Sequence, residues 1–124
     1  MRVKGIGWLG TRTERYEQMV QFSTDVLGLT PSILLSDMAV FSFPNGDEFQ
    51  VFGPENEDLP YPNVPVAAFL VDEVESARAE MESKGVRFIG ATESHDDVTW
   101  AYFRAPDGHV YEIVSRPDGK LPVL

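Results

Sequence analysis

The chain has 124 residues, 43% of them hydrophobic and 24% charged, which is typical of one globular domain. Its 10 basic and 20 acidic residues give a formal net charge of −10, which excludes nucleic acid and anionic membranes as favoured partners because their phosphates would be repelled. The absence of cysteine excludes disulfides and thiolate chemistry, and we expect a cytoplasmic protein without a signal peptide.

The first half of the chain predicts a strand, a helix and three further strands. The strands are predicted at residues 3–10, 32–35, 38–43 and 48–52. Thr13 can cap the helix, and Gly28 is the residue expected just past its end. Side chains at helical spacing predict one buried stripe on this helix: Tyr16, Met19, Val20, Ser23, Val26 and Leu27.

The second half predicts the same order of elements. Its strands are predicted at residues 64–71, 86–90, 99–105 and 109–114. Asp72, as the cap, and Glu75 form a capping-box pair at the start of the helix, and Gly85 marks its end. We therefore expect one domain with these parts: a first module at 1–53, a polar, unrepeated linker at 54–63, a second module at 64–116 and a peripheral tail at 117–124.

Two segments match each other at an offset of half the chain length. Residues 43–51 (FPNGDEFQV) and 105–113 (APDGHVYEI) each contain a strand, a Pro-Asn/Asp-Gly turn and a second strand. The match predicts two similar modules that share one core, with a ligand site near the axis between them.

Three further segments carry a likeness to a known family: Phe22 with residues 25–29 (DVLGL), residues 69–74 (FLVDEV) and residues 106–112 (PDGHVYE). With them, the tandem of modules resembles the vicinal oxygen chelate superfamily, which holds glyoxalase I, extradiol dioxygenases, fosfomycin resistance thioltransferases and bleomycin resistance proteins. The resemblance implies an α+β fold of tandem βαβββ modules. In that fold, curved mixed sheets surround a central cavity and the helices lie outside.

The resemblance also implies where a metal would be held. Superfamily enzymes take one ligand for a divalent metal from each of four strands, and the matching positions here are Trp8, Gln50, Val66 and Glu112. Trp and Val offer no ligating atom, and Gln offers only a neutral carbonyl oxygen. One carboxylate and one carboxamide are too little for zinc, iron or a hard cation. We therefore expect no cofactor, and a divalent metal only if a displaced site exists.

Glu112 alternates with two valines on one face of its predicted strand. Pairing across the turn makes Tyr102 its predicted neighbour, and Trp100 shares that face. In one interpretation these three residues line a cavity in the concave sheet. In the other, the aromatic residues are core and Glu112 pairs with Arg104, because a carboxylate between valines must be satisfied.

The predicted ligand-binding set is completed by neutral side chains: Trp8, Met38, Val40, Gln50 and Val66. Trp8 either stacks on the ligand or plugs the position vacated by the metal. Because Met38 and Val40 are the repeat partners of Trp100 and Tyr102, one half of the cavity is predicted to be apolar and the other aromatic.

The two histidines lie in polar segments. His95, within residues 93–97, is either a general base whose pKa Asp96 tunes or a solvated loop residue. His109 follows a turn glycine and is predicted to stabilise the turn. The catalytic candidates are therefore Glu112 and His95, and no triad, phosphate loop or dinucleotide fingerprint is present.

Together these patterns predict a metal-free protein that captures a flat or cationic organic ligand in an aromatic, acidic cleft. The alternative is a lyase, isomerase or dioxygenase of the same superfamily that uses Glu112 as base or a displaced metal site. A regulatory or scaffolding relative without a ligand is a third reading. The expected partners are a small molecule and a second copy of the chain, with Trp8, Phe52 and Tyr61 available for the dimer contact.

Overall fold

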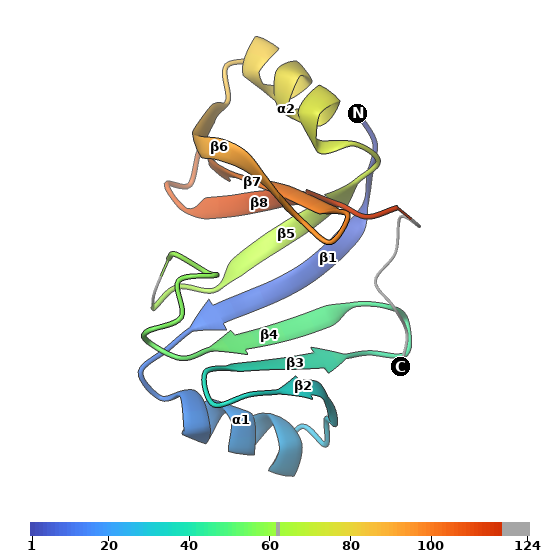
Figure 1. Ribbon diagram of the computed structural model, residues 1–124. Coiled ribbons are helices and arrows are strands. Elements are labelled where there is room, and N and C mark those ends of the chain that lie inside the picture. The colour runs from blue at the N-terminus through green and yellow to red at the C-terminus, as the bar shows by residue number, and fades with distance from the viewer. Residues whose placement is uncertain (62, 118–124) are drawn as a thin grey trace. The chain divides into compact units, whose positions relative to one another are not determined.

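The computed structural model describes residues 1–61 and 63–117, which divide into two compact units. The N-terminal unit is Trp8–Val66, and the C-terminal unit joins Met1–Gly7 to residues 67–117. Each unit contains one helix and its own set of paired strands (Figure 1). Among the described residues, no helix is long and apolar enough to cross a membrane.

The N-terminal unit has the element order strand, helix and three strands. Its elements are the part of β1 (Val3–Arg12) from Trp8 onwards, α1 (Tyr16–Asp25), β2 (Pro31–Leu34), β3 (Met38–Ser42) and β4 (Glu48–Phe52). The spatial order is β2-β3-β4-β1, in which β1 is parallel to β4 and the other pairs are antiparallel. Helix α1 covers one face of these strands, where Tyr16 packs with Ala39, Phe41 and Val51.

The C-terminal unit repeats this order. Its elements are β5 (Val66–Val71), α2 (Val74–Ser83), β6 (Arg87–His95), β7 (Val98–Arg104) and β8 (Val110–Ser115). The spatial order is β5-β8-β7-β6, in which β5 is parallel to β8 and the other pairs are antiparallel. Val74 and Ala77 of α2 pack on Phe103 and Ile113. The predicted α+β fold of two βαβββ modules is confirmed.

Both helices end shortly before the predicted glycines, α1 at Asp25 and α2 at Ser83. Gly28 and Gly85 have φ angles of +69° and +92°, a left-handed conformation that residues with a Cβ rarely adopt. The backbone N–H of Gly85 donates to the carbonyl of Glu82 at 3.0 Å, which closes the last turn of α2.

The start and the last apolar residues of α1 differ from the prediction. Thr13 does not cap the helix, because its hydroxyl accepts the N–H of Arg15 at 3.0 Å and so closes a turn before the helix begins at Tyr16. Val26 and Leu27, predicted to be buried, are 67% and 53% exposed. They follow the last helical residue, so they leave the buried stripe.

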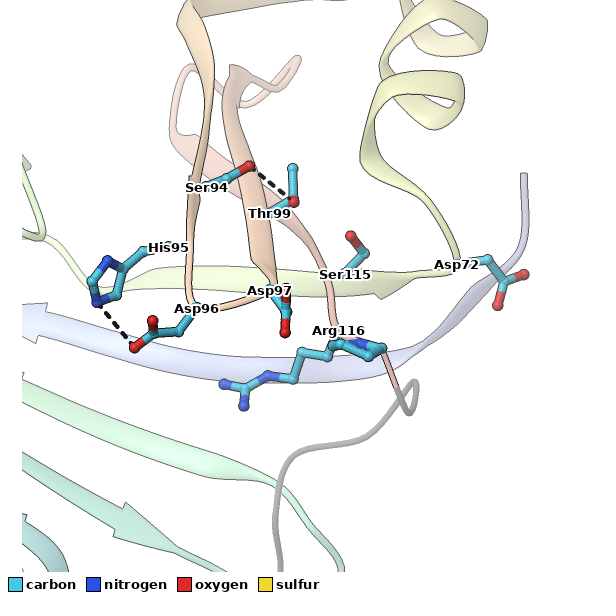
Figure 2. A pocket seen from close by; sticks show the side chains of 9 residues that line it. Asp72, Ser94, His95, Asp96, Asp97, Thr99, Ser115 and Arg116 are labelled. Carbon is cyan, nitrogen blue, oxygen red and sulfur yellow. Dashed lines mark hydrogen bonds and ion pairs between the residues drawn. The ribbon is translucent and has the colours of Figure 1, made fainter.

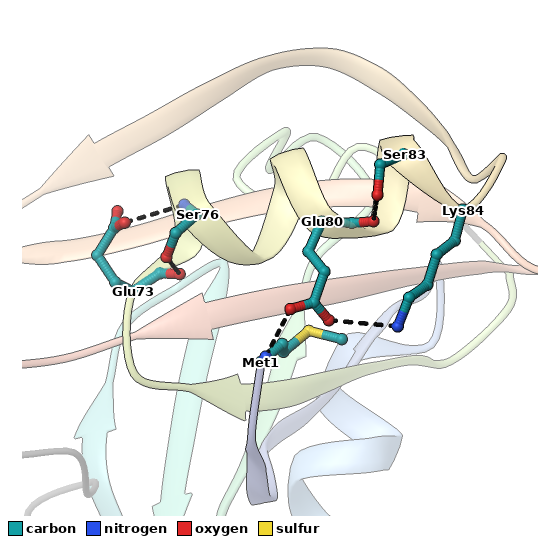
Figure 3. A network of polar contacts seen from close by, with 6 residues as sticks. All are labelled: Met1, Glu73, Ser76, Glu80, Ser83 and Lys84. Carbon is teal, nitrogen blue, oxygen red and sulfur yellow. Dashed lines mark hydrogen bonds and ion pairs between the residues drawn. The ribbon is translucent and has the colours of Figure 1, made fainter.

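The cap of α2 also differs from the prediction by one residue. The carboxylate of Glu73, not that of Asp72, accepts the N–H of Glu75 at 2.8 Å and that of Ser76 at 2.9 Å. Figure 3 shows the bond to Ser76. These bonds lower the pKa of Glu73. Asp72 instead pairs with the Lys4 ammonium at 2.9 Å.

Strand β6 is longer than predicted, because the polar residues up to His95 still pair with β7 beyond a register shift between Ile89 and Glu93.

The predicted linker, of which all but residue 62 is described, is hydrogen-bonded to β1. The Arg12 guanidinium donates to the carbonyls of Pro54 and Leu59, and Leu59 is buried. Of the predicted tail, only Pro117 lies within the described residues.

Candidate functional site

Two residue pairs of the N-terminal unit form its face opposite α1. Val40 lies opposite Gln50, and Met38 lies opposite Phe52. Because side chains alternate along a strand, Met38, Val40 and Gln50 lie on the face that the helix leaves free. Trp8 shares this face, since it lies two residues before Gly10, the partner of Gln50 on β1.

The equivalent face of the C-terminal unit carries the predicted carboxylate. Glu112 lies opposite Tyr102 on β7 and Ala68 on β5, as the sequence predicted for the tyrosine. Trp100 lies opposite Val114, the next residue of β8 on that face. The side chain of Glu112 is 1% exposed, and that of Tyr102 is 5% exposed. The structure therefore brings Glu112, Tyr102 and Trp100 together on neighbouring strands.

Val66 and Arg104 are two further residues that the sequence placed near Glu112. Val66, which is 2% exposed, opens β5 and alternates with Ala68 on the face that carries Glu112. Arg104, the alternative partner of Glu112, donates to the carbonyl of Gly108 at 2.6 Å and is exposed. The arginine therefore has a local role in closing the turn between β7 and β8.

Sequence reasoning missed one buried carboxylate. Glu48 is 9% exposed, and its Oε1 accepts the side-chain N–H of Gln50 at 2.6 Å. The two residues alternate on β4 and so share one face. The helix-free face of the N-terminal unit is thus acidic as well as apolar, whereas the sequence predicted it to be apolar. Its spacing of two residues from Gln50 could have placed Glu48 on this face. Its repeat partner in the second module is the apolar Val110, so the repeat did not indicate a carboxylate there.

The donor atoms at the four superfamily positions do not fit a divalent metal. Only Gln50 and Glu112 carry ligating atoms, and the ligating atom of Gln50 is a neutral carbonyl oxygen, while its amide N–H donates to Glu48. In residues 1–61 and 63–117, no group of three or more His, Cys, Asp or Glu side chains is placed to hold a metal ion.

The second catalytic candidate, His95, lies at the exposed end of β6. Its imidazole is 79% exposed, and its Nε2 lies 3.3 Å from Oδ2 of Asp96. It lines an open polar pocket of about 480 Å³ together with Asp72, Asp97 and Arg116 (Figure 2). Glu112 does not line this pocket, so the structure does not bring the two catalytic candidates together there.

His109 lies in the turn before β8, as predicted. Its backbone N–H donates to Oδ1 of Asp107 at 2.9 Å, and its side chain is exposed. The contribution of this residue to the turn is thus made by its backbone.

The chain is similar in fold to several solved structures. A methylmalonyl-CoA epimerase in complex with methylmalonyl-CoA and NH4⁺ matches with a TM-score of 0.74 and 17% identity, over 98% of this chain and 100% of that one. A Streptomyces coelicolor methylmalonyl-CoA epimerase matches with a TM-score of 0.73 and 18% identity, over 94% and 99% of the two chains. The Mn(II)-bound glyoxalase from Novosphingobium aromaticivorans matches with a TM-score of 0.70 and 23% identity, over 92% of this chain and 39% of that one.

At these identities the structural matches show the fold alone. A comparison of the sequence with curated proteins gives no match. The family model for the Glyoxalase/Bleomycin resistance protein/Dioxygenase superfamily matches residues 5–113, which is most of the chain. The chain therefore belongs to the Glyoxalase/Bleomycin resistance protein/Dioxygenase superfamily.

Proposed function

We propose that this protein binds a flat or cationic organic molecule without a metal and releases it unchanged. The observation that carries the proposal is the position of Glu112. Its carboxylate belongs to a central strand, opposite Tyr102, on the sheet face that α2 does not cover. In this proposal the face contributes one wall of an aromatic, acidic cleft.

The chemistry of these side chains favours a cation with an aromatic ring. A carboxylate on a paired strand has a fixed position, so it can orient a positive group at little entropic cost. In this proposal the rings of Tyr102 and Trp100 would offer π faces to the ligand, and such faces attract cations and flat rings with about 0.5–2 kcal/mol per good contact. The net charge of −10 raises the local concentration of cations around the protein.

The N-terminal unit supports the same ligand class. Glu48 and Gln50 place an acidic group and an amide on its helix-free face, beside the apolar Val40 and Met38. Trp8, on the same face of this unit, adds an aromatic ring to these groups. A ligand with one charged and one apolar end would suit side chains of this kind.

The test compares ligands of matched shape and different charge. The indole N–H signals of Trp8 and Trp100 are followed by NMR while aromatic cations, neutral aromatics and aromatic anions are added. We expect cations to bind best, and Glu112→Gln to weaken cations about tenfold while neutral ligands are little affected, since a shielded charge contact is worth about 1–3 kcal/mol. Tightest binding of the anions, or unchanged cation affinity in Glu112→Gln, would contradict the proposal.

The alternative function is an enzyme of the same superfamily, favoured by the fold shared with methylmalonyl-CoA epimerases. In that case Glu112 would act as the base of a lyase or isomerase, or a displaced metal site would support a dioxygenase. Mass spectrometry of each bound ligand after long incubation distinguishes the two functions. A chemically altered ligand would support the enzyme, and an unchanged one the binding protein. Metal analysis of the purified protein tests the displaced site.

We also propose that the protein is a homodimer, with a contact that does not include Phe52, one of the three aromatic residues that the sequence indicated. Phe52 is only 5% exposed and is unavailable for a contact. Six exposed apolar side chains lie near the end of α1, on β2 and directly after it, and we call them the α1–β2 patch: Phe22, Val26, Leu27, Ile33, Leu34 and Leu35. Asp25 is the one charged residue in this stretch of a chain with net charge −10, which favours a second copy as the occupant.

A further inference from the structure

A second hollow lies on the opposite face of the C-terminal unit from Glu112. It has a volume of about 390 Å³ and lies beside the turn between β7 and β8. Its lining residues are Phe69, Phe103, Ala105, Pro106, Asp107 and Tyr111. Phe69, Phe103 and Tyr111 alternate with Ala68, Tyr102 and Glu112 along their strands, so the hollow and the proposed Glu112 site lie on different faces of the sheet.

Three aromatic rings form the floor of this hollow. The ring centroids of Phe69 and Tyr111 are 5.9 Å apart with an interplanar angle of 27°, and those of Phe103 and Tyr111 are 6.1 Å apart at 25°. The rings are therefore close to parallel, and those of Phe69 and Tyr111 are only partly buried. A flat ring entering the hollow would meet aromatic surface in a preformed arrangement.

At one position beside this hollow, the second module carries a smaller side chain than the first module. Phe103 and Tyr111 correspond to Phe41 and Phe49, whose rings pack in the same way with centroids 6.2 Å apart. Ala105, however, corresponds to Phe43. A methyl group thus stands where the first module has a phenyl ring, which leaves space above the aromatic floor.

The same comparison shows an acidic group that the first module lacks. Asp107 corresponds to Asn45, and Tyr111 to Phe49. The Tyr111 hydroxyl donates to Oδ2 of Asp107 at 2.7 Å, and the His109 N–H donates to Oδ1 at 2.9 Å. These hydrogen bonds lower the pKa of Asp107, so the carboxylate at the rim stays ionised at neutral pH.

We propose that this hollow is a second binding site, for a planar aromatic group that carries a positive charge. The ring would lie on Phe69, Phe103 and Tyr111 in the space that Ala105 leaves open. The positive group would face the carboxylate of Asp107, whose position is fixed by two hydrogen bonds. This site stands independently of the proposed function of Glu112, because it uses other residues on another face.

The experiment uses three probes of nearly equal shape: benzamidinium, benzamide and benzoate, with charges of +1, 0 and −1. Backbone amide signals of the full chain are followed by NMR during each titration. We expect benzamidinium to shift the amides of Ala105 and of residues 107–111 most strongly, benzamide to bind more weakly at the same place, and benzoate to bind least. Shifts confined to other residues, or benzoate binding as well as benzamidinium, would overturn the proposal.

Each test variant installs the residue that the first module has at the corresponding position. Ala105→Phe should fill the hollow and weaken both benzamidinium and benzamide at least tenfold. Asp107→Asn should weaken benzamidinium about two- to fivefold, the value of an exposed ion pair, and leave benzamide unchanged. Asp107 is exposed, so this variant tests the proposal even if Ala105→Phe does not fold.

Two outcomes separate this site from the proposed Glu112 site. If benzamidinium loses affinity in Glu112→Gln but keeps it in Ala105→Phe and Asp107→Asn, the second site is wrong and the Glu112 face is the binding surface. If it loses affinity only in the Ala105 and Asp107 variants, the second site stands and the proposed function of Glu112 fails for this ligand.

Discussion

A methyl group added to Gly7 would collide with a fully buried side chain. A Cβ built on Gly7 would lie 2.6 Å from Cγ1 of Val114, which is 0% exposed. Valine is branched at Cβ and cannot turn away in a packed core. We therefore expect Gly7→Ala to lower the free energy of unfolding by about 1–3 kcal/mol, measured by urea denaturation.

Gly10→Ala is the matched control, three residues along the same strand. Its built Cβ would lie 3.2 Å from Cδ2 of Leu59, the end of a flexible side chain that can move aside. Its effect should therefore be clearly smaller. Equal losses in the two variants would show that the contact with Val114 is not what makes the substitution at position 7 costly.

The Asp107–Tyr111 hydrogen bond gives a pH-dependent prediction. The carboxylate raises the pKa of Tyr111, and the pKa of Asp107 is lowered in turn. The pair therefore stabilises the fold between about pH 4 and pH 10, the ordinary values of the two groups. Its contribution is lost as the pH falls through the lowered pKa of Asp107 or rises through the raised pKa of Tyr111.

Spectrophotometric titration of the tyrosines measures this effect. In Asp107→Asn the pKa of Tyr111 should fall towards its ordinary value, while Tyr111→Phe identifies its part of the absorbance change. An unchanged titration of Tyr111 in Asp107→Asn would mean that the hydrogen bond does not form in solution.

At this scale, prediction from the sequence succeeded where strand alternation decides the outcome. The pairing of Glu112 with Tyr102 followed from the Pro106–Gly108 turn, because a tight turn sets the register of the strands it joins. Glu48 was missed because its repeat partner is apolar. Its burial depends on tertiary contacts that one strand pattern does not encode.

At the scale of elements, the cap of α2 gives a prediction about local stability. Glu73→Ala should expose the N–H groups of Glu75 and Ser76, since both donate to its carboxylate. We expect their amide hydrogen exchange to become several-fold faster and the thermal midpoint to fall. Asp72→Ala, which removes the acid that pairs with Lys4, should leave these two amides protected.

Faster exchange of these two amides in Asp72→Ala only would show that Asp72, and not Glu73, caps the helix. The sequence could not separate these neighbours, because both are acids and the helix start depends on backbone angles at one residue. The same limit applies to Thr13, whose hydroxyl serves a turn instead of the helix. The helix ends were predictable, because Gly28 and Gly85 occupy left-handed conformations that favour glycine.

At the scale of the whole molecule, the repeat was sufficient to predict two modules of the same architecture. Each turn fixes a local hairpin, and each glycine fixes a helix end, so the order of elements follows from short-range chemistry. The grouping of residues 1–7 with residues 67–117 was not predictable in this way. It depends on contacts between residues that are far apart in the sequence.

The proposed homodimer gives the last prediction. The α1–β2 patch includes Leu34, which is 58% exposed on β2, a strand with one free edge. Such an edge can pair with the same strand of a second copy, and the surrounding apolar side chains would then be buried. We expect light scattering to show a dimer at micromolar concentration. Leu34→Glu should weaken it at least tenfold, because an unpaired carboxylate buried in the contact costs more than about 1.4 kcal/mol.

Val64→Glu is the matched control, since Val64 is 43% exposed and lies outside the α1–β2 patch. This variant carries the same added charge and should dimerise like the unaltered protein. Both positions are exposed, so neither substitution should lower the thermal midpoint of unfolding of the single chain. A monomeric unaltered protein at these concentrations would refute the dimer. Equal weakening by the two variants would instead attribute the effect to net charge and remove the α1–β2 patch as the contact.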